Sequence, residues 1–201
     1  MKLVLASNNA KKLVELQALF APLGIELVTQ GSLGIPEAEE PFDSFVENSL
    51  TKARHAARLS GLPALADDSG LAVEGLNGAP GVLSARYATL FGQPKSDADN
   101  NRVLIEQMAA VTDRAARFVC SLVAVRSAAD PEPLIAMGRW QGQILSAPQG
   151  EGGFGYDPLM LIPSLGRSVA QLGASEKNTL SHRALAAAEL VRQMREVWHL
   201  G

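Results

Sequence analysis

The sequence has few of the features that mark several large protein classes. Its 201 residues contain one cysteine, which excludes an internal disulfide, and no Cys/His cluster suggests a zinc site. No apolar run reaches membrane-spanning length, and the stretch after Met1 is too short for a signal peptide. We therefore expect a soluble, cytoplasmic protein that does not act on a membrane.

A basic excess is also missing. The chain has 18 Lys and Arg against 21 Asp and Glu, for a net charge of −3, whereas proteins that bind nucleic acid normally carry excess positive charge. Aromatic residues make up only 5% and are not interleaved with basic ones. We expect no nucleic-acid partner, although a small basic pocket for one anionic molecule stays possible.

What is present is typical of a globular domain. Hydrophobic residues make up 47% and charged residues 19%, which excludes general disorder. The length favours one domain, or two lobes that share a core. The single cysteine, Cys120, lies in the apolar run 118–123 and reads as a small buried hydrophobe in a strand.

Hydrophobic periodicity predicts strands that alternate with helices. Two helices should end at Gly24 and Gly61, a third should begin at Ser96 or Asp97, and the last should begin near Ser181. The predicted strands cover 3–6, 25–28, 63–66 with 71–73, 116–125, 134–145 and 159–162. This order predicts an α/β fold with a mixed sheet and helices outside it.

The segment 7–12 joins the first strand to the first helix and places Lys11 and Lys12 at the helix start. The free N–H groups there carry partial positive charge, so cations are unfavourable unless an anion binds at the same place. A bound polyphosphate would make both lysines favourable. The alternative is that the lysines simply extend into solvent.

Asp67 and Asp68 stand side by side at the end of a strand. Because successive strand side chains point to opposite faces, both cannot face one site. One should be structural, and the other could hold a hard cation such as Mg²⁺ or position a water molecule. The alternative is that Asp-Ser-Gly marks an ordinary turn.

Three further groups of residues could also take part in binding a nucleotide. Asn48 and Lys52 share one face of the second helix, as either functional or solvated residues. The glycine-rich loop 152–157 holds two aromatics, which could stack on a nucleobase or cover the core. His182 and Arg183 stand at another helix start, with Lys177 in the loop before it. Together these residues indicate a site for a nucleoside triphosphate with Mg²⁺.

Six segments carry a more specific signal: SNNAKK (7–12), FVENSLTKA (45–53), ADDSGL (66–71), GAPG with SARY (78–87), GFGYDP (153–158) and EK with SHR (176–183). In this order, across nearly the whole chain, they resemble the non-canonical purine nucleoside triphosphate pyrophosphatase family (ITP/dITP/XTP pyrophosphatases) of the bacterial type.

The resemblance implies one domain over residues 1–201, with an α/β fold built as a mixed twisted sheet with flanking helices and two lobes around a central cleft. It also implies a homodimer. The implied reaction is the Mg²⁺-dependent hydrolysis of ITP, dITP or XTP to the monophosphate and pyrophosphate, which removes these nucleotides from the pool.

The resemblance further implies a role for each matching residue. Asp68 would be the catalytic base and a metal ligand, assisted at the metal by Glu39 or its neighbour Glu40. Ser69 would contact substrate. The triphosphate would be held by Ser7, Asn8, Asn9, Ala10, Lys11, Lys12 and Lys52. The base and ribose would meet Phe154, Gly155, Tyr156 and Asp157, and the base would be read by Lys177, His182 and Arg183.

One position departs from the family pattern. Asn8 stands where the family usually has glycine. Glycine suits a positive φ or a close approach to phosphate, and Asn tolerates positive φ better than most other residues with side chains, so we expect the loop to keep its shape.

Two other functions fit the same inventory. The enzyme could act on another nucleotide, such as a modified pyrimidine triphosphate, which substrate profiling would reveal. The chain could also be a nucleotide-binding regulator that does not hydrolyse its ligand, although a carboxylate beside a Mg²⁺ site argues against this.

Overall fold

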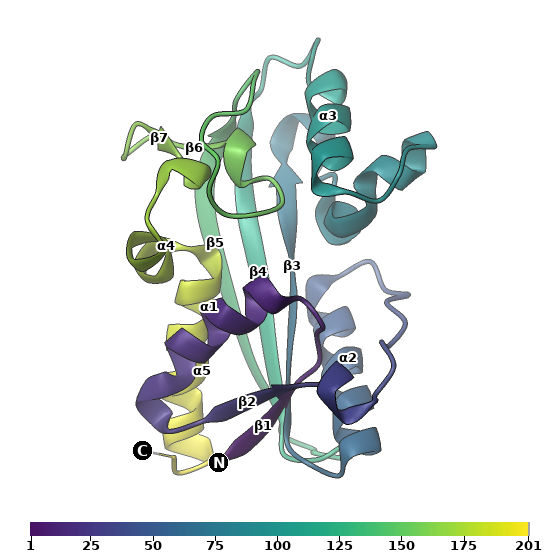
Figure 1. Ribbon diagram of the computed structural model, residues 1–201, viewed down its shortest axis with the longest axis vertical. Coiled ribbons are helices and arrows are strands. Elements are labelled where there is room, and N and C mark those ends of the chain that lie inside the picture. The colour runs from purple at the N-terminus through teal and green to yellow at the C-terminus, as the bar shows by residue number, and fades with distance from the viewer. Residues whose placement is uncertain (201) are drawn as a thin grey trace. The chain divides into compact units, whose positions relative to one another are not determined.

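The computed structural model describes residues 1–200, which form a seven-stranded sheet in the order β2-β1-β3-β4-β5-β6-β7 (Figure 1). Strand β1 runs parallel to β2 and β3, whereas β6 runs antiparallel to β5 and β7, so the predicted mixed sheet is confirmed. The strands are β1 (Lys2–Leu5), β2 (Glu26–Thr29), β3 (Ala64–Val73), β4 (Ala115–Val125), β5 (Leu134–Ile144), β6 (Met160–Ile162) and β7 (Arg167–Ser168).

Five α-helices accompany these strands in residues 1–200: α1 (Ala10–Phe20), α2 (Phe45–Ser60), α3 (Asp97–Gln107), α4 (Ala174–Leu180) and α5 (His182–Val197). Gly61 and Ser96 mark helix boundaries as predicted, whereas α1 ends at Phe20 and Gly24 instead ends a 3₁₀ helix (Ala21–Leu23). Ser44 caps the start of α2, Gly61 ends it in a left-handed conformation, and Ser96 caps α3. None of these helices combines the length and the apolar character that crossing a bilayer requires.

Three features differ from the prediction. The segment 174–180, which contains Lys177, was expected to be a loop before the last helix but forms the short helix α4. Ser181, in an extended conformation, separates α4 from α5. The segment Gly81–Phe91 is a 3₁₀ helix that apolar periodicity did not indicate. Strand β7 was also missed, since two residues are too few for a detectable alternation.

The chain divides into two compact units, and three of the boundaries fall inside β3, β4 and β5. Unit 1 contains Met1–Asp68, Cys120–Gly138 and the chain from His182 onward. Unit 2 contains Ser69–Val119 and Arg139–Ser181. Each unit has its own hydrophobic clusters. The cleft between two lobes stays a prediction.

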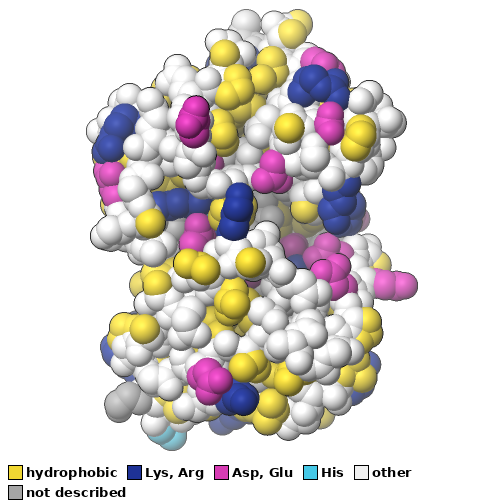
Figure 2. All heavy atoms as spheres, viewed as in Figure 1, with side chains coloured by type: hydrophobic (Ala, Val, Ile, Leu, Met, Phe, Trp, Pro, Cys, Tyr) yellow, Lys and Arg dark blue, Asp and Glu magenta, His cyan; other side chains and the backbone are white. Residues whose placement is uncertain are grey.

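The alternation of β1 explains how unit 1 is layered. Leu3 and Leu5 pack with Leu16 of α1 and Leu190 of α5, whereas Val4 packs with the alanines of α2. Helices α1 and α5 therefore cover one face of these strands, and α2 covers the other, as the ribbon shows (Figure 1). On the molecular face drawn in Figure 2, basic and acidic side chains are interspersed.

Candidate functional site

The loop between β1 and α1 is shaped by its own polar side chains. Asn9 caps α1, because its Oδ1 accepts hydrogen bonds from the backbone N–H groups of Lys11 (3.0 Å) and Lys12 (3.1 Å). The N–H of Asn9 in turn donates to Ser7 Oγ at 3.2 Å. The helix therefore begins at Ala10, after the short loop 6–9 that follows β1, as an anion site of this type requires.

The two lysines at this helix start have different surroundings. Lys11 is exposed, whereas Lys12 is only 16% exposed and its Nζ lies 2.6 Å from Asp67 Oδ1. A buried carboxylate thus stabilises one of the two cations in the free protein. The unfavourable placement seen in the sequence is offset for Lys12 before any phosphate binds.

Asn8 does not need a positive φ: within residues 1–200, only Asn77 and His199 combine a side chain with positive φ. Its side chain instead forms a tether. Oδ1 accepts from the N–H of Gly31 (2.9 Å) and Nδ2 donates to Glu37 (3.2 Å). A Cβ on Gly31 would lie 2.5 Å from Asn8 Oδ1, so this contact needs glycine there.

Asp67 is the structural member of the aspartate pair. It is fully buried, and Arg183 Nε donates to its Oδ2 at 2.7 Å while Lys12 holds Oδ1. Burial alone would raise the pKa of Asp67, but Arg183 and Lys12 outweigh that and hold the pKa well below its ordinary value. Arg183 Nη1 also donates to Glu15 at 2.6 Å, and Cys120 Sγ lies 3.5 Å from Asp67.

Asp68 lies on the opposite face of β3 and is less completely paired. Lys52 Nζ lies 2.9 Å from its Oδ1 and 2.6 Å from Glu40 Oε1. Its Oδ2 is buried without a hydrogen-bond partner among the described residues. Burial raises the pKa of Asp68 above its ordinary value, because it outweighs the opposing effect of Lys52. When Asp68 is ionised, its carboxylate would be stabilised by a second cation bound beside Lys52.

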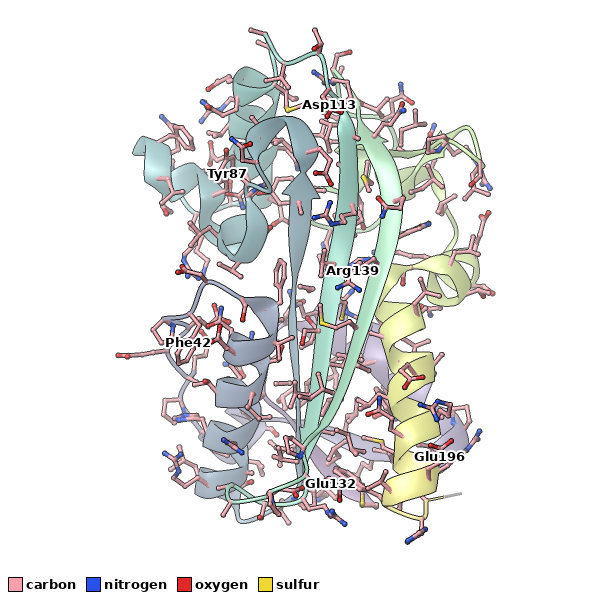
Figure 3. The ribbon with its side chains drawn as sticks, turned by 180° about the vertical axis from the view of Figure 1, so that it is seen from behind. Phe42, Tyr87, Asp113, Glu132, Arg139 and Glu196 are labelled. Carbon is pink, nitrogen blue, oxygen red and sulfur yellow. The ribbon has the colours of Figure 1, made fainter. Side chains whose placement is uncertain are left out.

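The acidic loop before α2 is fastened to that helix at several points. Asn48 is buried and binds both backbone groups of Phe42, with Oδ1 accepting from N (3.1 Å) and Nδ2 donating to O (3.0 Å). Figure 3 shows Phe42 in the loop beside α2. Lys52, four residues after Asn48 in α2, binds Glu40 of the loop. Glu39, by contrast, is exposed. Of the two glutamates, the structure thus places Glu40 on the lysine that also binds Asp68.

His182 and Arg183 open α5, where both are buried. Their position depends on Gly138 of β5, a residue that the sequence analysis missed. A Cβ on Gly138 would lie 1.9 Å from His182 O and 2.7 Å from Ala186 N, so only glycine lets the strand pack this closely against the helix start. The sequence did contain a signal for this contact, because a glycine inside a strand often marks the close approach of another backbone.

In unit 2, the glycine-rich loop is organised around Asp157. Its Oδ2 accepts from the N–H of Phe154 (2.9 Å) and from Lys177 Nζ (2.7 Å), and that Nζ lies 4.5 Å from the centre of the Phe154 ring. Lys177 and Asp157 are both buried. The structure therefore brings three predicted base-binding residues together and places Lys177 in α4, where it was expected in a loop.

The two aromatics of this loop have different environments. Tyr156 is buried in a core cluster with Leu71 and Trp140, its Oη donates to Ser84 O at 2.8 Å, and burial raises its pKa. Phe154 is half-buried. Tyr156 thus matches the alternative of an aromatic covering the core, and Phe154 is the ring at the polar cluster. Ser69, also half-buried, follows Asp68 in β3.

The donor set can be tested for its fit to a metal. No group of three or more His, Cys, Asp or Glu side chains within residues 1–200 could hold an ion by itself. Magnesium, however, is usually held by one or two carboxylates together with substrate phosphates and water. Asp68, with its unpartnered Oδ2, and Glu40 fit an ion that arrives with a polyphosphate.

Comparison with known proteins gives consistent results. The Ham1 family model matches residues 3–193. Proteins named "dITP/XTP pyrophosphatase" from Methylibium petroleiphilum (62% identical; 98% of this chain and 99% of the relative) and Leptothrix cholodnii (60% identical; 100% of both) are similar over their full length. A solved HAM1 protein from Coxiella burnetii is similar with a TM-score of 0.89 and 44% identity, covering 98% of this chain and 100% of that one.

Proposed function

This chain belongs to the Ham1 family, and we propose that it hydrolyses non-canonical purine nucleoside triphosphates, namely ITP, dITP and XTP, to the monophosphate and pyrophosphate. The relatives named dITP/XTP pyrophosphatase support the substrate class. The observation that carries the chemistry is the carboxylate of Asp68, which is buried, raised in pKa and unpartnered at Oδ2.

The phosphates are assigned to unit 1. The segment Ser7, Asn8, Asn9, Ala10, Lys11 and Lys12 places two lysines at the start of α1, where Asn9 binds the N–H groups of Lys11 and Lys12 in the free protein, and Lys52 adds a buried ammonium. Lys12 and Lys52 are held by carboxylates before substrate binds, so they stabilise developing phosphate charge with little reorganisation. Little covalent chemistry is then required of the protein.

In the proposed reaction, Asp68 accepts a proton from a water molecule whose oxygen attacks the α-phosphorus. A new P–O bond forms, the bond from that phosphorus to the α,β-bridging oxygen breaks, and pyrophosphate leaves with the bonding pair. Lys52 keeps Asp68 oriented through Oδ1. The raised pKa of Asp68 makes it a better proton acceptor than an ordinary aspartate.

Mg²⁺ is the proposed cofactor, held by Asp68 with Glu40 as the assisting residue, although the resemblance leaves Glu39 as the other candidate. Bound Mg²⁺ would offset phosphate charge and favour departure of pyrophosphate. Glu40 is preferred because it shares Lys52 with Asp68, whereas Glu39 is exposed.

Base recognition is assigned to Phe154 and Asp157 with Lys177, His182 and Arg183. Phe154 supplies a stacking face. Lys177 and Arg183 are donors, which suit the 6-oxo acceptor of hypoxanthine and xanthine. The 6-amino group of adenine would confront these two cations with a donor in place of an acceptor, which disfavours adenine.

The deciding experiment follows the label from ¹⁸O-water into products. Purified protein with Mg²⁺ is given ITP, dITP, XTP, GTP, ATP and dTTP separately, and each product is analysed by mass spectrometry. We expect pyrophosphate from the first three, with little from the others, and the label in the monophosphate. Label in pyrophosphate would mean attack at the β-phosphorus and would overturn the proposed step.

The same experiment separates the alternatives. Preferred turnover of dTTP or another pyrimidine would contradict the purine assignment, and tight binding without turnover would make the chain a regulator. Omission of Mg²⁺ with added EDTA should abolish activity, and unchanged activity would contradict the metal assignment.

We also propose that the protein is a cytoplasmic homodimer. Light scattering during size exclusion should give twice the chain mass of 21.2 kDa. A mass near that of one chain at micromolar concentration would contradict the dimer.

A further inference from the structure

Both backbone polar groups of Gly155, the residue between Phe154 and Tyr156, are bound by side chains of α3. The N–H of Gly155 donates to Asp97 Oδ2 at 2.8 Å, and its carbonyl accepts from Asn101 Nδ2 at 2.8 Å. The partners lie more than fifty residues apart in the sequence and inside the same unit. We call this arrangement the α3 clamp.

The clamp is built on a well-fixed helix end. Ser96 caps α3, since its Oγ accepts from the N–H of Asp99 at 3.0 Å and donates to that carboxylate at 2.7 Å. Asp97 and Asn101 are four residues apart and so share one helix face. The amide of Asn101 has a defined orientation, because Nδ2 faces two acceptors, Gly155 O and Asp97 O (2.9 Å).

The clamp acts on a residue with unusual conformational freedom. Gly155 has φ +60, in the left-handed region where glycine suffers no steric penalty. Its own peptide can therefore adopt other conformations unless it is held. Phe154 precedes it directly, and a change of backbone angle at Gly155 would move the Phe154 ring away from Lys177 and Asp157.

We propose that Asp97 and Asn101 are positioning residues that hold Phe154 for base stacking and so set the preference of the enzyme among purine bases. This inference rests on the proposed function. The clamp acts only through the loop backbone, and both residues lie in unit 2, whereas the phosphates are assigned to residues of unit 1. Its loss should therefore affect base discrimination and KM more than kcat.

The test compares kcat/KM for ITP with kcat/KM for GTP. Each clamp hydrogen bond has a net strength that corresponds to roughly a 3- to 10-fold effect, so we expect Asn101→Ala to lower the ITP/GTP ratio by about that factor. Asp97→Ala should have a smaller effect because its bond is exposed to water. Asp97→Asn retains an acceptor oxygen and should restore most of the ratio.

Asp99→Ala is the matched control. Like Asp97→Ala, it removes one negative charge from the first turn of α3. Asp99 binds Ser96 and Arg102 but not the loop, so the variant loses a helix-cap contact and leaves the clamp intact. An equal fall in activity toward every triphosphate in the clamp variants, or an equal change of the ratio in Asp99→Ala, would show a merely structural role and overturn the proposal.

Hydrogen exchange of the peptide that contains Gly155 gives a readout that does not depend on activity. We expect faster exchange in Asp97→Ala than in Asp99→Ala, measured on the free protein. If wild type hydrolyses no triphosphate, the proposed function fails while exchange still reports on the clamp. Faster exchange with an unchanged ITP/GTP ratio would overturn the specificity role, and unchanged exchange would overturn the clamp itself.

Discussion

The two faces of β3 carry adjacent carboxylates in opposite surroundings. Asp67 is bound by two cations and has a lowered pKa, whereas Asp68 shares one lysine with Glu40 and has a raised pKa. Both are buried, so burial does not distinguish them. The difference is the charge around each group, since two cations bind Asp67, whereas one lysine binds Asp68 and the carboxylate of Glu40 opposes it.

The two neighbouring aspartates therefore have separate roles, with Asp67 assigned to stability and Asp68 to reactivity. A buried carboxylate paired with two cations stays ionised and resists protonation, and removing it leaves buried charge unpaired, whereas an incompletely compensated one can accept a proton or a cation. The predictions below test that separation, beginning with the largest expected effect.

Asp68→Asn should lower kcat/KM for ITP by about 10²- to 10⁴-fold, the usual contribution of a general base, with no loss of thermal stability. Steady-state kinetics and a melting curve on the same sample check both parts. A variant that keeps full activity would remove Asp68 from the mechanism.

Asp67→Ala should destabilise the fold by about 3–5 kcal/mol, because it leaves the buried Arg183 without its inner counter-charge. Urea unfolding measures this, and Asp67→Asn is the milder substitute if the alanine variant does not accumulate.

Arg192→Ala is the matched control, since Arg192 binds two carboxylates on the exposed surface, where solvent screening leaves ion pairs little net contribution to stability. Similar losses for Asp67→Ala and Arg192→Ala would contradict the assignment of Asp67 as a buried structural centre.

The two aspartates should also give opposite pH dependence of stability, measured by urea unfolding in EDTA. The lowered pKa of Asp67 means that its stabilisation is present above the unfolded pKa and is lost as pH falls through the folded value. The raised pKa of Asp68 means that stability falls as pH rises from its unfolded pKa to its folded one.

Each slope is at most about 1.4 kcal/mol per pH unit for one proton. Asp67→Asn should therefore flatten the acid side of the stability curve, and Asp68→Asn should gain stability relative to wild type as pH rises. The same slope change in both variants would refute the contrast.

Asn8→Gly should have the smallest effect, a rise of roughly 2- to 10-fold in KM for ITP at nearly constant kcat, because two hydrogen bonds at the surface are lost. Gly31→Ala should act similarly by displacing Asn8. The double variant should be no worse than the more affected single one, and additive effects would show that the two residues do not act through one contact.

Local sequence signals predicted the cap Gly61, a helix start at Ser96 or Asp97, and the opposite facing of Asp67 and Asp68, because these depend on near neighbours. They could not predict that Glu15 binds Arg183, 168 residues away. The helical position of Lys177 was missed because α4 has only seven residues. The tether of Asn8 depends on a glycine in a different segment, which no periodicity reveals.

The lone cysteine lies against the Asp67 cluster and provides a natural reporter. Cys120 is fully buried, and burial, reinforced by Asp67, raises its pKa well above the ordinary value, so the native thiol is both shielded and protonated. A thiol-labelling reagent can react only when this part of the core opens. The rate of labelling therefore measures how often the core around Asp67, Arg183 and Lys12 opens in the unmodified protein.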